Sequence, residues 1–358
     1  MTSLQEQGRA AKAASFTLAA AKTSKKNEAL SAIARILADR KDQWLKANAR
    51  DVEAAKEAGM RPAMLDRLTL TSERIDEIVE GIRQIISLPD PVGRVDRMET
   101  RPNGLIIGRR RVPLGVIAMI YEARPNVTVD AAALCLKSGN VCILRGGKEA
   151  FFSNCCAVEL MREALFGAGL PKDCISLVQD TSREAAGELM HMNEYVDVLI
   201  PRGGAGLIRR VAKEASVPVI RTGEGVCHIY VDSEADLTMA AEILYNAKCS
   251  RPSVCNAAEC VLVHRDVAEA FWQKALPLLD EHQVSLRADE EAAKILGDRS
   301  VPAKEEDWDA EYGDYILAVR TVGGLEEAAA FINAHGTGHS ECIITANYFK
   351  AQRFLDVI

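Results

Sequence analysis

The chain has 358 residues, of which 48% are hydrophobic and 27% are charged. This composition is typical of a globular protein large enough for two domains, and it excludes a disordered or fibrous chain. The net charge of -7 argues against nucleic acid as a partner, because no strong positive field would attract the phosphate backbone. Anion binding would have to come from local arginines and helix N-termini.

The sequence has no feature of an exported or membrane protein. Residues 1–16 lack the apolar core of a secretory signal, and the longest strongly apolar run, residues 112–121, is too short to cross a bilayer. The 10 cysteines contain no C-x-x-C pair, so we expect reduced thiols and no structural zinc. His335 and His339 are closely spaced, but the loop between them contains glycines, which argues against a metal site. We therefore expect a cytoplasmic protein with no membrane segment and no metal.

The chain begins with a helical region followed by a hairpin. Hydrophobic residues recur at helical spacing over residues 3–22, 25–57 and 73–87, and Ser72 is placed to cap the last of these helices. Residues 92–112 then alternate like strands on both sides of Asn103-Gly104, the strongest short signal for a hairpin. Such an arm would be either solvated or paired with a second subunit.

From residue 115 the pattern becomes an alternation of strands and helices. Strands are predicted at residues 116–121, 141–145, 175–178, 196–200 and 217–220, and helices at 127–137, 151–168, 183–192 and 205–215. This alternation predicts a parallel, doubly wound sheet that binds its ligand at the carboxyl ends of the strands.

A second α/β unit is predicted after about residue 231. Strands fit residues 229–231, 259–264, 316–321 and 341–345, and helices fit 235–248, 267–280, 289–296 and 325–334. Because no flexible linker separates the halves, we expect two docked domains, residues 1–230 and 231–358.

Polar loops follow the predicted strands of the first domain. Residues 145–148 (Arg-Gly-Gly-Lys) and 201–206 (Pro-Arg-Gly-Gly-Ala-Gly) combine glycines, which let backbone approach a ligand, with cations that suit a phosphate. Each also fits an ordinary turn, and no G-x-G-x-x-G motif is present. In a third loop, Pro125 separates strand from helix, and Arg124 suits a carboxylate or phosphate. Asn126 could donate to an oxyanion or simply cap the helix.

One cysteine lies in a loop that favours reactivity. Most cysteines in such a protein are small buried hydrophobic residues. Cys255, however, follows Lys248 and Arg251 in the loop before the strand at 259–264, where exposure and positive charge would lower its pKa. A thiolate there could attack an acyl carbon. Cys249 is the nearest rival.

Several segments, in this order, resemble the γ-glutamyl phosphate reductases of the aldehyde dehydrogenase superfamily. They are residues 109–130, 143–150, 199–207, 225–232, 246–259 and 335–345, and the resemblance extends over essentially the whole chain. It implies an aldehyde-dehydrogenase-like α/β fold. Residues 1–230 would form the NADPH-binding domain, with the hairpin 92–112 as an oligomerisation arm, and residues 231–358 the catalytic domain.

The resemblance also implies roles for individual residues. Cys255 would be the nucleophile and Asn126 would stabilise the oxyanion. The implied cofactor contacts are Arg145, Gly146, Gly147, Lys148, Gly203, Gly204 and Glu311, and the implied substrate contacts are Arg124, Arg251 and His228. A cation at position 148 suits a 2′-phosphate and favours NADPH. By ungapped counting, a water-activating glutamate would fall at Thr222, beside Glu224, so we expect no such base.

The implied reaction is the reduction of L-glutamyl 5-phosphate to L-glutamate 5-semialdehyde through a cysteine thioester, the second step of proline synthesis from glutamate. The implied partners are a second copy of the chain, as a homodimer or higher homo-oligomer, and glutamate 5-kinase. Ending at Ile358, the chain stops short of a C-terminal segment that the family carries. One alternative is a CoA-acylating aldehyde dehydrogenase, which shares the thioester step, and the other is a truncated subunit that only binds cofactor or a partner.

Overall fold

The computed structural model describes residues 3–220 and 225–358, and the chain divides into two units, residues 1–222 and 223–358. The division comes earlier than the boundary predicted at residue 230. The reason is that β7 (Cys227–Val231) pairs with strands of the second unit, β8 and β12, and so belongs to it.

Helices form the beginning of the first unit, as predicted, but with different boundaries. They are α1 (Leu4–Ala19), α2 (Thr23–Asp39), α3 (Lys41–Glu57), α4 (Pro62–Leu68) and α5 (Ser72–Ser87). The prediction of one helix over residues 25–57 is wrong, because Arg40 leaves helical geometry (φ -113°, ψ 26°) between α2 and α3. The cap of α5 is Thr71, whose hydroxyl accepts from the Arg74 amide at 3.2 Å, in place of Ser72.

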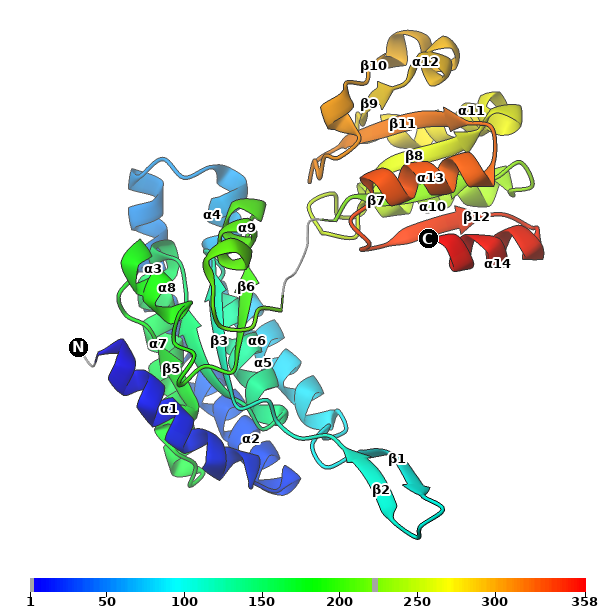
Figure 1. Cartoon of the computed structure of the whole chain (residues 1–358). Coiled ribbons are helices and arrows are strands. Elements are labelled where there is room, and N and C mark those ends of the chain that lie inside the picture. Colours follow the sequence, from blue (N-terminus) through cyan, green and yellow to red (C-terminus); the bar gives the residue numbers. More distant parts are fainter. Residues whose placement is uncertain (1–2, 221–224) are drawn as a thin grey trace. The chain divides into compact units, whose positions relative to one another are not determined.

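The predicted hairpin is confirmed. Strands β1 (Val95–Thr100) and β2 (Ile106–Arg110) pair antiparallel and project as an arm from the first unit (Figure 1). Nearly every residue of both strands is exposed. Large apolar side chains are among the exposed residues of the arm and its flanks: Val95, Met98, Leu105, Ile106, Ile107, Val112 and Leu114. Two strands without a covering layer are marginally stable alone in water.

The parallel sheet of the first unit has the strand order β5-β4-β3-β6. Its elements are β3 (Val116–Tyr121), α6 (Pro125–Lys137), β4 (Val141–Arg145), α7 (Phe151–Gly167), β5 (Ile175–Leu177), α8 (Arg183–Leu189), β6 (Val198–Arg202) and α9 (Ala205–Glu214). Strands β3 and β4 are buried along almost their whole length, as expected of a sheet covered on both faces.

One predicted strand of this unit is reduced to a single bridge. Residues 217–220 pair with β6 through one isolated parallel bridge, between Leu199 and Val219. Pro218 has no amide hydrogen, which limits any ladder at this edge.

The second unit contains a parallel sheet of order β10-β9-β11-β8-β7-β12. After β7 come α10 (Leu237–Cys249), β8 (Ala258–His264), α11 (Ala268–Asp280), β9 (Ser285–Ala288), α12 (Glu290–Leu296), β10 (Ser300–Pro302), β11 (Ile316–Val322), α13 (Leu325–His335), β12 (Glu341–Ile344) and α14 (Tyr348–Val357). Residues of α10–α12 form one core with the sheet, and residues of α13 and α14 form another. The sequence analysis missed β9, β10 and α14.

Within the described ranges, no helix is long and apolar enough to cross a lipid bilayer.

Candidate active site

Polar loops meet at the carboxyl edge of the first sheet. Ile120 pairs with Arg145 and Tyr121 pairs with Arg202, so the loops that follow β3, β4 and β6 are neighbours. The winding reverses here, because β4 and β5 lie on one side of β3 and β6 lies on the other. A reversal point at the carboxyl edge is where open α/β sheets bind ligands.

The loop after β4 combines an anchored arginine with a free lysine. The guanidinium of Arg145 donates to the carbonyls of Thr181 and Ser182 at 2.5 and 2.9 Å, and therefore holds the segment that leads into α8. Lys148, by contrast, is exposed and has no hydrogen bond or ion pair to any residue that the structure describes. Only Lys148 of these two is thus available as a cation for a ligand.

The two glycines of this loop differ in how closely they are packed. A Cβ on Gly146 would lie 2.2 Å from Nδ2 of Asn154, whose side chain completes a buried chain of hydrogen bonds from Tyr121 through Thr128. A Cβ on Gly147 would approach the Glu149 carboxylate to 2.6 Å. The structure therefore gives Gly146 a packing reason that is independent of any cofactor, whereas the flexible Glu149 side chain could move away from a Cβ on Gly147.

The loop after β6 already holds an anionic group. Gly204 is the N-cap of α9, and its amide donates to Oε2 of Glu122 at 3.1 Å. Gly203 packs against the same side chain, since a Cβ there would lie 2.6 Å from Cδ of Glu122. The positive end of a helix dipole and its free amides favour such a carboxylate, and they would equally favour a phosphate.

The third loop leads into α6. Arg124 is the N-cap of this helix and Pro125 its first residue, so the interpretation of Asn126 as the cap is wrong. Asn126 lies in the first turn and donates its amide to Oδ2 of Asp130 at 3.1 Å. Burial raises the pKa of Asp130, although this hydrogen bond and the charge of Arg202 oppose the shift.

Cys255 lies in the second unit, at the amino edge of its sheet. Its loop, residues 250–257, joins α10 to the amino end of β8, which pairs with the amino end of β7. All 10 cysteines fall within the described ranges, and Cys255 alone is exposed. The rival Cys249 is buried, and burial raises its pKa.

The backbone of Cys255 is held from one side. Its carbonyl oxygen accepts a hydrogen bond from Sγ of Cys227 at 3.3 Å, and a Cβ on Gly225 would lie 1.7 Å from the same oxygen. Turns within the loop add hydrogen bonds from Val254 to Arg251 and from Ala257 to Val254. The carbonyl is fixed while the thiol stays exposed.

The basic neighbours of Cys255 differ from the expectation. Lys248 is fully buried and forms an ion pair with Glu259 at 2.6 Å, so it offers no free positive charge to the thiol. Arg251 is exposed, and its side chain makes no hydrogen bond or ion pair in the part of the chain that the structure describes.

The other two predicted site residues of this unit, Glu311 and His228, differ in their exposure to solvent. Glu311 is exposed in the loop before β11, and its charge acts on Glu259. His228 is buried against Phe331, and Glu341 accepts from its amide at 2.9 Å and lies 3.0 Å from its Nδ1. In this position the His228 ring is out of reach of a dissolved substrate. Thr222 and Glu224 lie outside the described residues.

The sequence profile of the Aldehyde dehydrogenase family matches residues 3–295. The chain belongs to the aldehyde dehydrogenase family. It is 53% identical over 358 residues to a γ-glutamyl phosphate reductase of Enterococcus faecalis, covering 100% of this chain and 86% of that protein. It is 54% identical over 352 residues to the enzyme of the same name from Moorella thermoacetica, covering 84% of it.

Solved structures show the same relationship. The γ-glutamyl phosphate reductase of Thermotoga maritima superimposes with a TM-score of 0.97 at 43% identity, over 100% of this chain and 86% of that one. A propionaldehyde dehydrogenase of Rhodopseudomonas palustris, at 15% identity and a TM-score of 0.70, shares the fold. The predicted family and fold class are confirmed.

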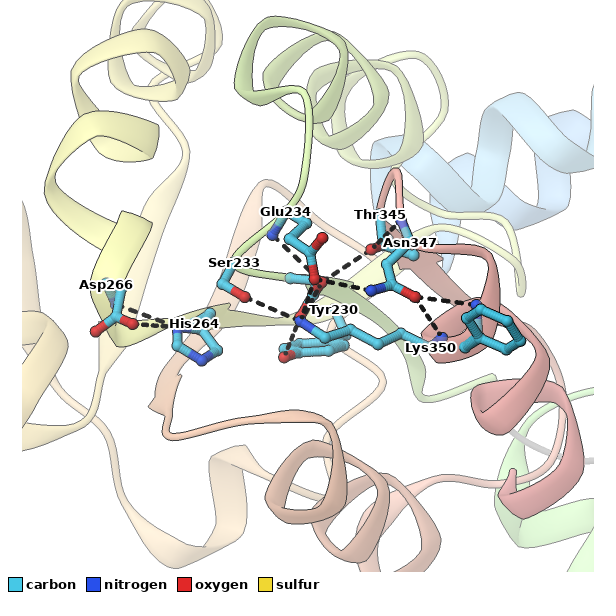
Figure 2. Close-up of polar contacts among 10 residues, drawn as sticks. Tyr230, Ser233, Glu234, His264, Asp266, Thr345, Asn347 and Lys350 are labelled. Carbon is cyan, nitrogen blue, oxygen red and sulfur yellow. Dashed lines mark hydrogen bonds and ion pairs between the residues drawn. The ribbon is translucent and has the colours of Figure 1, made fainter.

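This aldehyde dehydrogenase closes the carboxyl edge of its second sheet. Beyond β7 and β12, the buried carboxylate of Asp232 accepts from Lys350, Thr345 and Tyr230 (Figure 2). Burial opposes its ionisation, but these hydrogen bonds outweigh burial and hold the pKa of Asp232 below its ordinary value. No group of three or more side chains among the described residues could hold a metal ion.

The loop before β12 lies within residues 335–345, which carry part of the resemblance, but no role in the site was predicted for it. His339 lies with Nδ1 3.7 Å from Sγ of Cys227, and Thr337 accepts from the Val226 amide at 3.1 Å. This loop therefore borders the segment that holds the Cys255 carbonyl. The signal in the sequence was a run of small and polar residues between a helix and a strand, which is too common to be specific.

Proposed function

We propose that this chain reduces L-glutamyl 5-phosphate to L-glutamate 5-semialdehyde, with Cys255 as nucleophile and NADPH as reductant. The observation that carries this proposal is the exposed thiol of Cys255 on a fixed backbone, in a chain 53% identical to a γ-glutamyl phosphate reductase. The cytoplasm, where thiols stay reduced, suits a reaction that needs a free thiolate.

The Cys255 thiolate attacks the acyl carbon, and the bond from that carbon to the phosphate oxygen breaks, which leaves a thioester and free phosphate. NADPH, when bound, supplies a hydride to the acyl carbon. The carbon–sulfur bond then breaks, releasing the aldehyde and restoring the thiolate. Asn126 would donate to the oxyanion, and Arg124 and Arg251 would bind the anionic groups of the substrate.

The carboxyl edge of the first sheet suits the cofactor. The Gly204 amide already binds a carboxylate, so the N-terminus of α9 can accept an anion such as the pyrophosphate. The free ammonium of Lys148 suits the 2′-phosphate that distinguishes NADPH from NADH. Glu311, exposed at the amino edge of the second sheet, would bind the nicotinamide ribose.

The test is phosphate-dependent oxidation of glutamate 5-semialdehyde, measured with NADP⁺ and with NAD⁺. Cys255→Ser should lower kcat by about 10³-fold or more, because a hydroxyl is a far weaker nucleophile. Ser253→Ala, an exposed change on the same loop, should leave kcat within about twofold. Near-normal turnover by Cys255→Ser would refute the mechanism. Activity that requires CoA in place of phosphate would favour the CoA-acylating alternative.

The hairpin supports an oligomeric enzyme. Its exposed apolar side chains include Met98 and Ile106, at 67% and 62% exposure, on strands without a covering layer. A second copy would bury them and satisfy the free strand edge. Ile106→Lys should shift sedimentation toward the monomer, and an unchanged mass would contradict this assembly. The same measurement with glutamate 5-kinase added tests that association.

A further inference from the structure

A buried ion pair lies directly beneath the loop that carries Cys255. Lys248, near the end of α10, and Glu259, near the start of β8, bring Nζ and Oε2 to 2.6 Å, and their side chains are 0% and 1% exposed. Residues 250–257 form the loop between these two ends. The pair thus closes the base of the nucleophile's loop.

Stability alone does not account for such a pair. Moving two charges out of water is costly, and well-packed apolar side chains of similar volume often give equal or greater stability. Burial lowers the pKa of Lys248 and raises that of Glu259, which shows the cost that their mutual attraction must offset. A pair of this kind is therefore better explained by the chain segments that it holds in position.

The pair also holds a second segment. The Gly313 amide donates to Oε1 of Glu259 at 3.2 Å, and Nζ of Lys248 lies 6.0 Å from the ring centroid of Tyr312. These two residues directly follow Glu311, whose like negative charge adds to burial in raising the pKa of Glu259. One oxygen of the Glu259 carboxylate is therefore bound to α10, and the other to the loop that presents Glu311.

We propose that Lys248 and Glu259 are positioning residues that fix Glu311 relative to Cys255, so that the cofactor's ribose and the acyl carbon meet in the correct register. This inference rests on the proposed function. The backbone of Cys255 is held separately by Gly225 and Cys227. Loss of the pair should therefore displace Glu311 more than it displaces the thiol.

The test removes both charges together, because a single substitution would leave an unpaired buried ion. Lys248→Met/Glu259→Met should fold, and its Cys255 should react with iodoacetamide within about twofold of the wild-type rate. Its kcat should fall about tenfold or more, since small misplacements of positioned groups lower rates strongly. Combination with Glu311→Gln should give little further loss, because both changes remove the same contact.

A matched control exists in the first unit. The buried Lys26 and the half-buried Asp90 form another ion pair at 2.7 Å, and Lys26→Met/Asp90→Leu should leave kcat within about twofold. An equal loss in this control would overturn the proposal. So would unchanged kcat in the Lys248/Glu259 variant, or a loss fully additive with that of Glu311→Gln.

If the double variant does not fold, the charge-swapped variant Lys248→Glu/Glu259→Lys tests the proposal instead. It keeps a charge pair between α10 and β8 but removes the acceptor of the Gly313 amide. Its kcat should fall by a similar factor, and full activity would overturn the proposal. Full activity of Glu311→Gln would also overturn the proposal, because Glu311 would then make no contact that needs positioning. Activity of Cys255→Ser at the wild-type level would instead refute the proposed function, so the two failures are distinguishable.

Discussion

In the first sheet, the winding reverses between β3 and β6, and the carboxyl edge there carries glycines, the exposed Lys148 and a helix N-terminus that binds Glu122. In the second sheet the winding reverses between β7 and β12, and the same edge is filled by Asp232 and Lys350. The candidate nucleophile, Cys255, lies at the amino edge instead.

This difference shows that strand topology creates a possible binding site at the edge of a sheet. The side chains at that edge then determine whether a ligand can bind there. At the first reversal point, exposed amides and a free cation can bind an anion. At the second, a buried carboxylate already has a cation and hydroxyl donors, so no ligand is needed there. At the amino edge of the second sheet, close backbone contacts fix the otherwise irregular loop that carries the candidate nucleophile.

Among the changes that test this comparison, the largest expected effect concerns that fixed loop. Gly225→Ala would place a Cβ 1.7 Å from the Cys255 carbonyl oxygen, so the backbone of the loop must shift. We expect kcat/KM to fall by about 10²-fold, because a misplacement of 1 Å can have that effect. The control Gly324→Ala meets no atom within 4 Å and should keep full activity. Equal activity of the two variants would show that the contact does not fix the nucleophile.

The comparison also shows what the sequence could and could not reveal. Strand–helix alternation predicted β3, β4 and the carboxyl-edge loops, because periodicity and glycine-rich turns are local signals. The burial of Lys248 and His228 could not be predicted, since their partners meet them only in the folded chain. The pairing of β12 with β7 brings Glu341 to His228, and the packing of α10 on β8 brings Glu259 to Lys248. Arg40 was missed because no proline or glycine marks the break between α2 and α3.

The second prediction tests whether the closed edge is purely structural. Asp232→Asn removes the carboxylate that binds Lys350, and should lower the free energy of unfolding of the second unit by about 2 kcal/mol at pH 7. The KM and kcat of the folded variant should be unchanged. A raised KM with unchanged stability would show that Asp232 serves a ligand.

The same variant has a predictable pH dependence. The pKa of Asp232 is depressed in the folded state, so the unfolded state binds more protons and stability rises with pH. The contribution is complete above the unfolded pKa of about 3.9 and is lost as pH falls through the folded pKa. Urea unfolding from pH 7 down to pH 3 should show the two proteins converging in acid, and a constant difference would contradict this origin.

The third prediction concerns Lys148, at the carboxyl edge of the first sheet. Lys148→Glu replaces the free cation with a carboxylate that suits a ribose hydroxyl and repels a 2′-phosphate. The ratio of kcat/KM for NADPH to that for NADH should fall by about tenfold or more, which corresponds to about 1.4 kcal/mol. Lys213→Glu changes the net charge equally at the far end of α9 and should leave the ratio unchanged. If both variants shift it equally, the general field and not Lys148 sets the preference.

The smallest expected effect concerns Glu122, whose carboxylate occupies the amide that a pyrophosphate would use. If NADPH binds as proposed, it must displace this carboxylate or tolerate its negative charge. Glu122→Gln removes the charge and keeps the length of the side chain, so the dissociation constant of NADPH should fall about threefold. Cofactor titration by fluorescence measures it, preferably at low salt, where the charge is least screened. Weaker binding by the variant would mean that Glu122 contacts the ligand directly. The carboxyl edge of the first sheet would then be organised by its own carboxylate, as the carboxyl edge of the second sheet is by Asp232.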